Sequence, residues 1–233
     1  RGFAWLGASP HSFAGMKPIG PRYNNFYRQS IDMWDRFVRL LAIDVGLTWG
    51  GQLGWESTES GAHQLKNRVF ELQTRGHPCR LINRDELLKL EPRLTPGIVT
   101  AAVHTEIEGH VDPINVIRAC LQRVTESGST IHAETKAESF IMNGDLVKAV
   151  RTNHGVFECD SVVLAAGLGT TELAQTIGID LPQQESPGVV IRTNPQPALF
   201  NSVSVMHTPS SESGGPQAHI KQSSDGSVII GGG

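Results

Sequence analysis

The stretch CDSVVLAAGLGT, residues 159–170, limits the possible folds more than any other part of the chain. Residues 162–164 (Val-Val-Leu) lack polar alternation, which favours a strand covered on both faces, as in a parallel sheet. Small residues follow at 165–167, and a helix is then expected with Thr170 or Thr171 as its N-cap. In an open α/β sheet a ligand can lie against the backbone at such a strand end. Small residues there are also typical of tight packing between helix and sheet, so the pattern by itself allows both interpretations.

An amphipathic helix is predicted over residues 25–46, where apolar residues recur at spacings of three and four and a glycine closes the pattern. The apolar positions are Ile31, Trp34, Phe37, Val38 and Leu41. After this helix, Leu47, Trp49, Leu53 and Trp55 indicate a short strand or hairpin.

The strongest helix signal lies over residues 112–128. Asp112 is the expected N-cap, Pro113 suits the first helical position, and Gly128 suits the end. Four apolar residues fall on one face, so we expect the helix to pack that side against something large. They are Ile114, Ile117, Leu121 and Val124.

The other predicted elements are short. One helix is expected over about 60–75, and another begins at Asn83, with Glu86 completing a capping box. Residues 97–109 have a strand pattern. The dipeptides Asn143-Gly144 and His154-Gly155 predict turns within a three-stranded meander. Further strand patterns occupy residues 188–193, 202–207, 218–222 and 227–232.

Charge and hydropathy argue against several classes of partner. The chain has 20 Lys and Arg against 23 Asp and Glu, which gives no positive field for nucleic acid or anionic lipid. Its apolar runs are far shorter than the roughly 20 residues of a membrane-spanning helix. The first residues lack the continuous apolar core of a signal peptide, so we expect a cytoplasmic protein. Cys79, Cys120 and Cys159 are odd in number and widely spaced, which supports neither a disulfide framework nor a zinc site.

Two further patterns bear on metal and hydrolase chemistry. His104, Glu106 and His110 could all bind zinc, but their spacing does not match the helical H-E-x-x-H arrangement, so no metal site is expected. No Gly-x-Ser-x-Gly elbow is present, and a hydrolase gains no support. The chain begins at Arg1 rather than Met and closes on three glycines, so we expect a fragment of a longer protein.

Three motifs, in their order along the chain, resemble the D-amino-acid oxidase-like family of FAD-dependent oxidoreductases, the group with glycine oxidase, sarcosine oxidase and D-amino-acid dehydrogenase. Residues 111–113 (Val-Asp-Pro) resemble the family's turn before a helix, residues 162–167 its strand end against FAD, and residues 225–232 its strand toward the flavin ring. Each motif alone is short and degenerate, but the motifs occur in the family's order and the match covers most of the chain. The resemblance implies a mixed α/β fold: an FAD-binding dinucleotide-type fold, truncated at both ends, with an inserted antiparallel-sheet substrate domain.

The resemblance also implies a division into domains. Residues 1–46 and 110–180 would form a partial FAD-binding domain, residues 47–109 and 181–224 a substrate-binding domain, and residues 225–233 a strand returning toward the flavin. No G-x-G-x-x-G precedes a helix in the sequence. We therefore expect this polypeptide alone to bind FAD weakly or not at all.

Site residues follow from the resemblance. Small residues would contact FAD through the main chain: Gly2, Ala4, Ala137, Ala165, Ala166, Gly167, Gly231 and Gly232. Substrate-binding candidates are Trp49, Gln52, Arg192, His207 and His219. Arg192 could clamp a carboxylate. Each candidate also has an ordinary structural interpretation: core packing for the tryptophan, a structural hydrogen bond for each histidine, and a solvated strand position for Arg192.

The implied activity is oxidation of the C–N bond of an amino acid or secondary amine, in which a hydride passes to FAD and water hydrolyses the resulting imine. No side chain is assigned as a catalytic acid or base. Two alternatives stay open at this point. One is a non-catalytic or degenerate subunit that uses the same scaffold to bind a small molecule or a partner chain. The other is an FAD-dependent enzyme that oxidises a hydroxy acid or glycerol phosphate.

Overall fold

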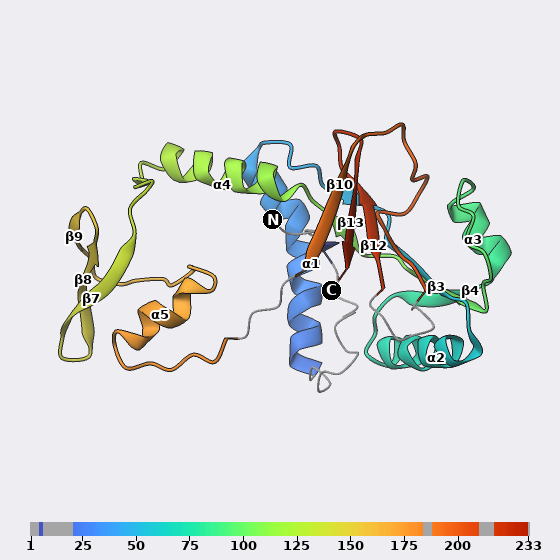
Figure 1. Cartoon of the computed structure of the whole chain (residues 1–233), viewed down its shortest axis with the longest axis horizontal. Coiled ribbons are helices and arrows are strands. Elements are labelled where there is room, and N and C mark those ends of the chain that lie inside the picture. The colour runs from blue at the N-terminus through green and yellow to red at the C-terminus, as the bar shows by residue number, and fades with distance from the viewer. Residues whose placement is uncertain (1–4, 7–20, 184–187, 210–216, 233) are drawn as a thin grey trace. The chain divides into compact units, whose positions relative to one another are not determined.

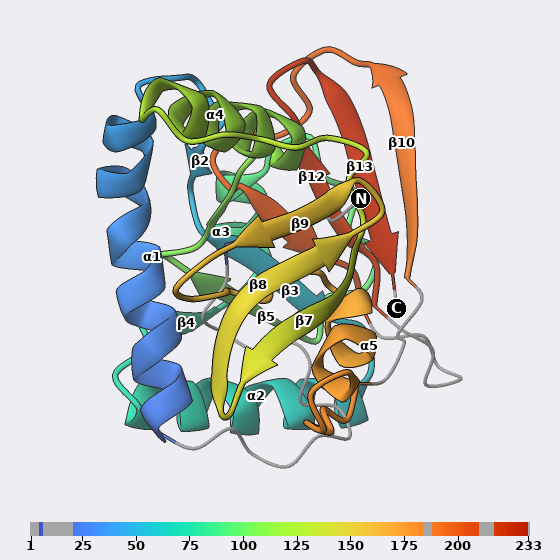
Figure 2. The ribbon, with the colours of Figure 1, turned by 90° about the vertical axis from the view of Figure 1, so that its left-hand side faces the viewer.

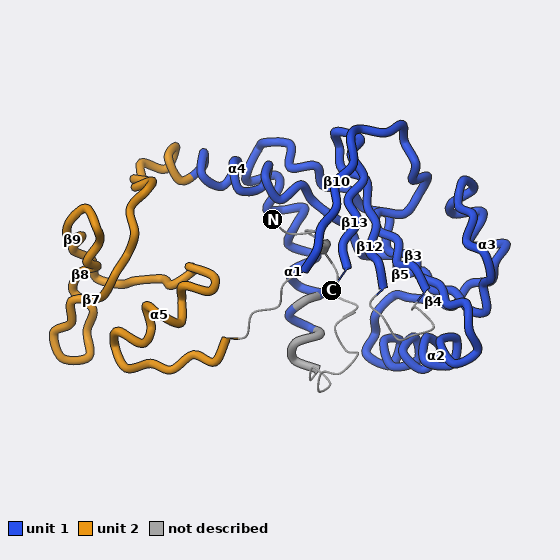
Figure 3. Tube along the Cα trace, viewed as in Figure 1, with its two compact units in different colours: residues 1–123, 188–233 blue, residues 124–187 orange. Residues whose placement is uncertain are grey.

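The computed structural model describes residues 5–6, 21–183, 188–209 and 217–232. The chain forms two compact units (Figure 3): a larger unit of residues 1–123 and 188–233, and a smaller unit of residues 124–187. Helices and strands both contribute to each unit, so the expected mixed α/β fold is confirmed. The domain division expected from the sequence stays a prediction.

The larger unit is built around two sheets (Figure 1). Its elements, in chain order, are β1 (Trp5–Leu6), α1 (Pro21–Leu41), β2 (Thr48–Trp49), β3 (Gln52–Glu56), α2 (Glu59–Thr74), β4 (Cys79–Ile82), α3 (Arg84–Leu90), β5 (Ala101–Thr105), β6 (Gly109–His110), most of α4 (Pro113–Glu126), β10 (Val189–Pro195), β11 (Val205–His207), β12 (His219–Gln222) and β13 (Ser227–Gly232).

The seven-stranded sheet has the order β10-β13-β12-β11-β3-β5-β4. Neighbouring strands are antiparallel except β11 and β3, which are parallel. One face carries the main apolar core, in which Leu53, Trp55 and Met206 pack with Leu87 of α3. On the other face, α2 covers the β5–β4 end through Val69, which packs with Cys79 and Val103. One face of the sheet is therefore covered by apolar side chains that include those of α3, whereas α2 covers the other face at its β5–β4 end.

The sequence signals at helix N-termini are largely confirmed. Asn83 and Glu86 form the predicted capping box at the start of α3. Asp112 accepts hydrogen bonds from the backbone N–H groups of Ile114 and Asn115 at 2.9 and 3.2 Å. These side chains satisfy backbone donors that have no partner within the helix.

The segment after α1 is not a hairpin. β2 pairs with β6 in a small sheet of order β1-β6-β2, whereas β3 belongs to the seven-stranded sheet. The chain passes from one sheet to the other at Gly51, whose φ of +76° favours glycine. A Cβ atom there would lie 1.9 Å from the carbonyl oxygen of Thr105. The two glycines at 50 and 51 therefore allow two adjacent strands to enter different sheets.

The predicted packing face of α4 is wrong. Ile114, Ile117, Leu121 and Val124 are 39–58% exposed. The helix instead turns Ala119, Val116 and Cys120 toward a core that includes Leu41 of α1. The residues that α4 buries therefore lie on a different face of the helix from the predicted one.

The smaller unit contains the end of α4 and four further elements: β7 (Ala137–Asn143), β8 (Leu146–Thr152), β9 (Gly155–Glu158) and α5 (Gly169–Gln175). The three strands form the predicted antiparallel meander (Figure 2). Gly144 follows β7 with a φ of +59°, as its turn requires. Helix α5 packs near β7.

Two predictions about residues 162–171 are wrong. Residues 162–164 pair with no strand of the described residues, because none lies beside them to complete a ladder. Neither predicted threonine caps α5, which begins after Leu168 without a side-chain cap. Thr170 instead accepts a hydrogen bond from the Ala166 N–H at 3.1 Å, and the Thr171 hydroxyl donates to the carbonyl of Leu181 at 3.1 Å.

Candidate functional site

Four residues form a row across the middle of the seven-stranded sheet. Gly231 of β13 lies opposite His219 of β12, His219 lies opposite His207 of β11, and His207 lies beside Gly54 of β3. Residues directly paired across strands share one sheet face. The row therefore brings together two predicted substrate residues and one predicted cofactor residue, although they lie up to 24 positions apart in the chain.

The neighbouring row on the same face contains three further polar residues among aliphatic ones. Lys221 of β12 pairs with Ile229 of β13, which pairs with Arg192 of β10, and Gln52 lies beside Val205 of β11. Alternate strand residues point to the same side, so this row shares the face of the histidines. We call this surface the histidine face, defined by Gln52, Gly54, Arg192, His207, His219, Lys221 and Gly231. The opposite face carries the apolar core of Leu53, Trp55 and Met206.

The two histidines are in direct contact. Their Nδ1 atoms lie 2.6 Å apart, and their ring centroids are 4.7 Å apart with planes inclined at 73°. His207 is buried, whereas His219 is partly exposed. Burial lowers the pKa of His219, because desolvation disfavours the imidazolium.

Lys221 is the largest fully buried side chain among the described residues. Its ammonium group donates a hydrogen bond to the carbonyl of Val111 at 2.8 Å. Burial lowers its pKa to about 8, the Asp112 carboxylate opposes this shift, and the Arg192 guanidinium adds to it. Lys221 was not among the predicted site residues. The alternation of His219 and Lys221 along a strand pattern was the signal that could have identified it.

Arg192 lies on the edge strand β10, and its guanidinium group already contacts side chains of the same protein chain. It forms an ion pair with Asp225 and donates to the Ser227 hydroxyl at 2.9 Å. The hydrogen bonds of Asp225 with Ser227 and with Arg192 hold the pKa of this carboxyl below its usual range. Arg192 thus anchors the turn between β12 and β13, and its predicted contact with substrate stays a prediction.

The structure separates Trp49 from the other substrate candidates. It lies in the small sheet on β2, is 36% exposed, and donates from Nε1 to the Asp35 carboxylate of α1 at 3.0 Å. Gln52, by contrast, is buried on the histidine face. Nearby, Glu56 accepts a hydrogen bond from the Gln217 amide at 2.9 Å.

The predicted cofactor residues fall in three places. Ala137 and residues 165–167 belong to the smaller unit, and Gly231 and Gly232 belong to the larger unit. Gly2 and Ala4 lie outside the described residues. Residues 165–167 are exposed, and no atom lies within 4 Å of the position that a Cβ of Gly167 would take. This open backbone of small residues fits the close approach of a flat or phosphorylated group.

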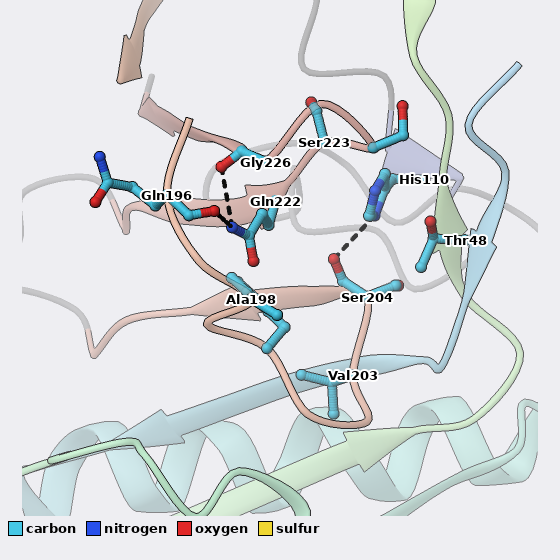
Figure 4. A pocket seen from close by; sticks show the side chains of 11 residues that line it. Thr48, His110, Gln196, Ala198, Val203, Ser204, Gln222, Ser223 and Gly226 are labelled. Carbon is cyan, nitrogen blue, oxygen red and sulfur yellow. Dashed lines mark hydrogen bonds between the residues drawn. The ribbon is translucent and has the colours of Figure 1, made fainter. Parts of the chain in front are cut away.

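A cavity of about 370 Å³ lies elsewhere in the larger unit (Figure 4). His110 donates from Nδ1 to the carbonyl of Ser204 at 2.9 Å, and Gln222 donates to the carbonyl of Gly226 at 2.9 Å. Burial, with Lys221, lowers the pKa of His110 to about 4. The cavity is lined by Thr48, His110, Gln196, Ala198, Phe200, Val203, Ser204, Gln222, Ser223, Ser224 and Gly226. No predicted substrate residue is among these lining residues.

A family model described as FAD dependent oxidoreductase matches residues 2–233. The chain belongs to this family. FAD is the family's cofactor, and the expected resemblance is therefore confirmed. In the part of the chain that the structure describes, no helix combines the length and the apolar character needed to cross a membrane.

Curated relatives of this FAD-dependent oxidoreductase are distant. The chain is 23% identical to a subunit of opine oxidase from Rhizobium meliloti, over 91% of this chain and 55% of that protein. It is 27% identical to glycine oxidase of Geobacillus kaustophilus, over 69% of this chain and 43% of that protein. With 4-methylaminobutanoate oxidase (formaldehyde-forming) of Paenarthrobacter nicotinovorans, it shares 25% identity over 71% of this chain and 20% of that protein. The chain thus spans about half the length of these relatives, or less.

Solved structures agree on the fold. The crystal structure of glycine oxidase from Geobacillus kaustophilus matches 99% of this chain and 60% of its own, with a TM-score of 0.81 and 19% identity. Glycine oxidase from Bacillus cereus gives a TM-score of 0.79 at 18% identity, over 99% of this chain and 61% of its own. At these identities the likeness concerns the fold alone.

Proposed function

We propose that the complete protein oxidises the C–N bond of an amino acid or secondary amine, with the substrate bound over the histidine face. The row of Gly231, His219, His207 and Gly54 carries this proposal, because it joins polar side chains to glycines on one sheet surface. Two relatives are named as glycine oxidase and 4-methylaminobutanoate oxidase, and both names describe oxidation of an amine. These names support an amino acid or secondary amine as the substrate.

In this proposal the small residues hold FAD. Ala137 and residues 165–167 of the smaller unit would contact the nucleotide through the main chain. The expected cofactor contacts of Gly231 and Gly232, which belong to the larger unit, stay a prediction. When bound, FAD would supply the redox chemistry as the hydride acceptor. The chain's own residues bind and orient the substrate: Gln52 offers an amide, and the imidazoles of the histidine face offer donors for a carboxylate.

The test uses the complete, flavin-loaded protein under anaerobic conditions. It is mixed with amino acids, N-methylated amino acids and secondary amines, and flavin reduction is followed by the loss of visible absorbance. Matched 2-hydroxy acids and glycerol phosphate are the comparison set. Reduction by at least one amine, with none by the comparison set, supports the proposal. Reduction by hydroxy compounds alone, or by no amine of the panel, would contradict it.

A second protein chain is also proposed as a partner. Two relatives, one from opine oxidase and one from sarcosine oxidase, are named as subunits of those enzymes. The exposed apolar residues of α4 leave a surface that another segment or chain could cover. Native mass measurement of the protein purified from its own cells, compared with the mass of the single chain, checks this.

A cytoplasmic location of the protein stays a prediction.

A further inference from the structure

The turn between β7 and β8 contains two groups that can react with each other and that the proposed function does not use. Asn143 ends β7 and pairs with Leu146 of β8, so Gly144 and Asp145 form a two-residue turn between them. Asn143, Gly144 and Asp145 are all exposed. This is the one Asn-Gly step in the sequence. Because glycine has no side chain, nothing on residue 144 hinders an approach of its backbone nitrogen to the Asn143 amide.

Hydrogen bonds hold neither of these two groups within the described part of the chain. The Asn143 side chain has no hydrogen-bond partner among the described residues, and the Gly144 N–H donates to no described carbonyl. Apart from its chain neighbours, no described atom lies within 4 Å of the position that a Cβ of Gly144 would take. The Asn143 amide can therefore turn, and the Gly144 nitrogen is not occupied.

The Asp225-Gly226 step could close the same kind of ring, but its groups are held. Asp225 forms an ion pair with Arg192 and accepts a hydrogen bond from the Ser227 N–H at 3.0 Å. The Gly226 N–H donates to the carbonyl of Ser223 at 2.9 Å. The structure thus leaves one of these two steps free to react and restrains the other.

We propose that Asn143 is a deamidation site, at which the folded protein converts asparagine to aspartate and isoaspartate. The Gly144 nitrogen loses its proton and attacks the side-chain carbonyl carbon of Asn143. The new C–N bond closes a succinimide ring, the bond from that carbon to the amide nitrogen breaks, and ammonia leaves with the proton. Water then opens either C–N bond of the ring, which gives aspartate or isoaspartate. The reaction changes no oxidation state and does not depend on the proposed function.

Both products alter the hairpin. Each replaces the neutral Asn143 amide with a carboxylate close to the exposed Asp145, so two like charges meet at the turn. Isoaspartate also lengthens the main chain by one carbon atom where residue 143 pairs with Leu146. Since a change in chain length disturbs strand register, β7 and β8 should open more often beside the turn. Hydrogen exchange of their amides should therefore be faster in aged protein than in fresh protein.

The experiment follows deamidation of the complete protein, folded or unfolded in denaturant, at neutral and mildly alkaline pH. Peptides from an acidic digest, which limits further reaction, are analysed by mass spectrometry. Asn143 in the folded protein should react at a rate within about tenfold of its rate in the unfolded chain. The rate should increase with pH, because the Gly144 nitrogen must lose a proton.

Asn153 is the internal comparison. Its side chain accepts from the Lys136 N–H at 2.8 Å and donates to the carbonyl of Glu134 at 3.4 Å, and a histidine follows it. In the folded protein, Asn153 should react at least about tenfold more slowly than Asn143. Methyl transfer by an isoaspartate methyltransferase locates the isoaspartate, which should form at residue 143 and not at Asp225 while the protein is folded.

The variant Asn143→Gln keeps an exposed amide but moves its carbonyl carbon one bond further from the Gly144 nitrogen, which disfavours ring closure. It should lose the deamidation of the β7 peptide and the faster hydrogen exchange on ageing. The matched control is Asn67→Gln, an exposed position of α2 that no glycine follows, and it should keep the reaction at Asn143 unchanged.

Three results would overturn the inference: reaction of Asn143 only in the unfolded chain, equal rates at Asn143 and Asn153 in the folded protein, or an unchanged signal in a folded Asn143→Gln variant. If this variant does not fold, the comparison of the folded and unfolded unmodified protein still decides. These measurements involve no amine oxidation, so their failure and the failure of the proposed function are distinguishable.

Discussion

At the scale of single residues, Lys221 has a clear consequence for stability. Its folded-state pKa of about 8 lies below the ordinary 10.5, so the unfolded chain binds more protons between these values. Folding stability should therefore rise as pH increases from 8 to 10.5, by roughly 3 kcal/mol relative to a variant without this lysine. Denaturant unfolding of the protein and of Lys221→Met across this pH range checks the difference. The exposed Lys66→Met is the control, and a Lys221→Met curve parallel to the unmodified protein would contradict the assignment.

Gly167 tests the nucleotide side of the site at the same scale. Its φ of +59° disfavours most side chains, but asparagine tolerates this region and nothing lies within 4 Å of the added Cβ. Gly167→Asn in the complete protein should therefore fold normally and lose flavin, because the added bulk occupies the place of the ligand. Gly167→Val should lose flavin too, with some added backbone strain. Flavin content per mole of folded protein is measured, and full retention in the Asn variant would refute the placement of FAD there.

At the scale of elements, Glu91 connects the end of α3 to the segment that leads into β11. Its buried carboxylate accepts hydrogen bonds from the backbone N–H groups of Asn201, Ser202 and Val203 at 2.8–2.9 Å. Glu91→Ala would leave these donors unpaired and should lower the free energy of unfolding by roughly 3 kcal/mol or more. Glu91→Gln keeps one acceptor oxygen and should cost less.

The same variant bears on the site, since β11 carries His207. Hydrogen exchange of the β11 amides should become faster in Glu91→Ala, ahead of the amides of α2. Glu86→Gln alters an exposed carboxylate of the same helix that accepts one backbone bond, so it should produce a much smaller change. Equal losses of stability in the Ala variant and this control would show that the Glu91 contacts contribute little.

The sequence predicts contacts between residues that are close in the chain better than it predicts packing and strand pairing between distant residues. The Asn83–Glu86 capping box and the Asp112 cap were predicted because each uses residues within three positions. The packing face of α4 was wrong because periodicity shows which residues are apolar, but not which neighbour will be close enough to cover them. Residues 162–164 failed as a strand for a related reason: a strand exists only through its partners.

The candidate site shows the same limit. His207 and His219 were predicted individually, but their contact depends on the β11–β12 register, which a single strand pattern does not contain. Lys221 was missed because its role depends on burial against Val111, which is 110 positions away in the sequence. Trp49 and Gln52 are neighbours in the sequence, yet the two glycines between them place them in different sheets.

At the scale of the whole molecule, the chain matches the FAD-dependent oxidoreductase family over residues 2–233 but spans only 60% of glycine oxidase from Geobacillus kaustophilus. Its sequence has no G-x-G-x-x-G before a helix, the motif whose backbone holds a pyrophosphate. The small residues expected to contact FAD provide room and main-chain groups, but no such cradle for the phosphates.

We therefore predict that the 233-residue polypeptide, expressed alone, binds FAD weakly or not at all, whereas the complete protein retains it. Without the phosphate contacts, too few interactions would offset the translational and rotational entropy that a large cofactor loses on binding. Flavin absorbance of both purified proteins, after matched incubation with FAD and gel filtration, measures the difference. Circular dichroism of the polypeptide must first show a folded chain. Tight, stoichiometric FAD on the folded polypeptide would mean that its own residues supply the phosphate site, with the small-residue backbone at 165–167 as the segment able to approach the phosphates.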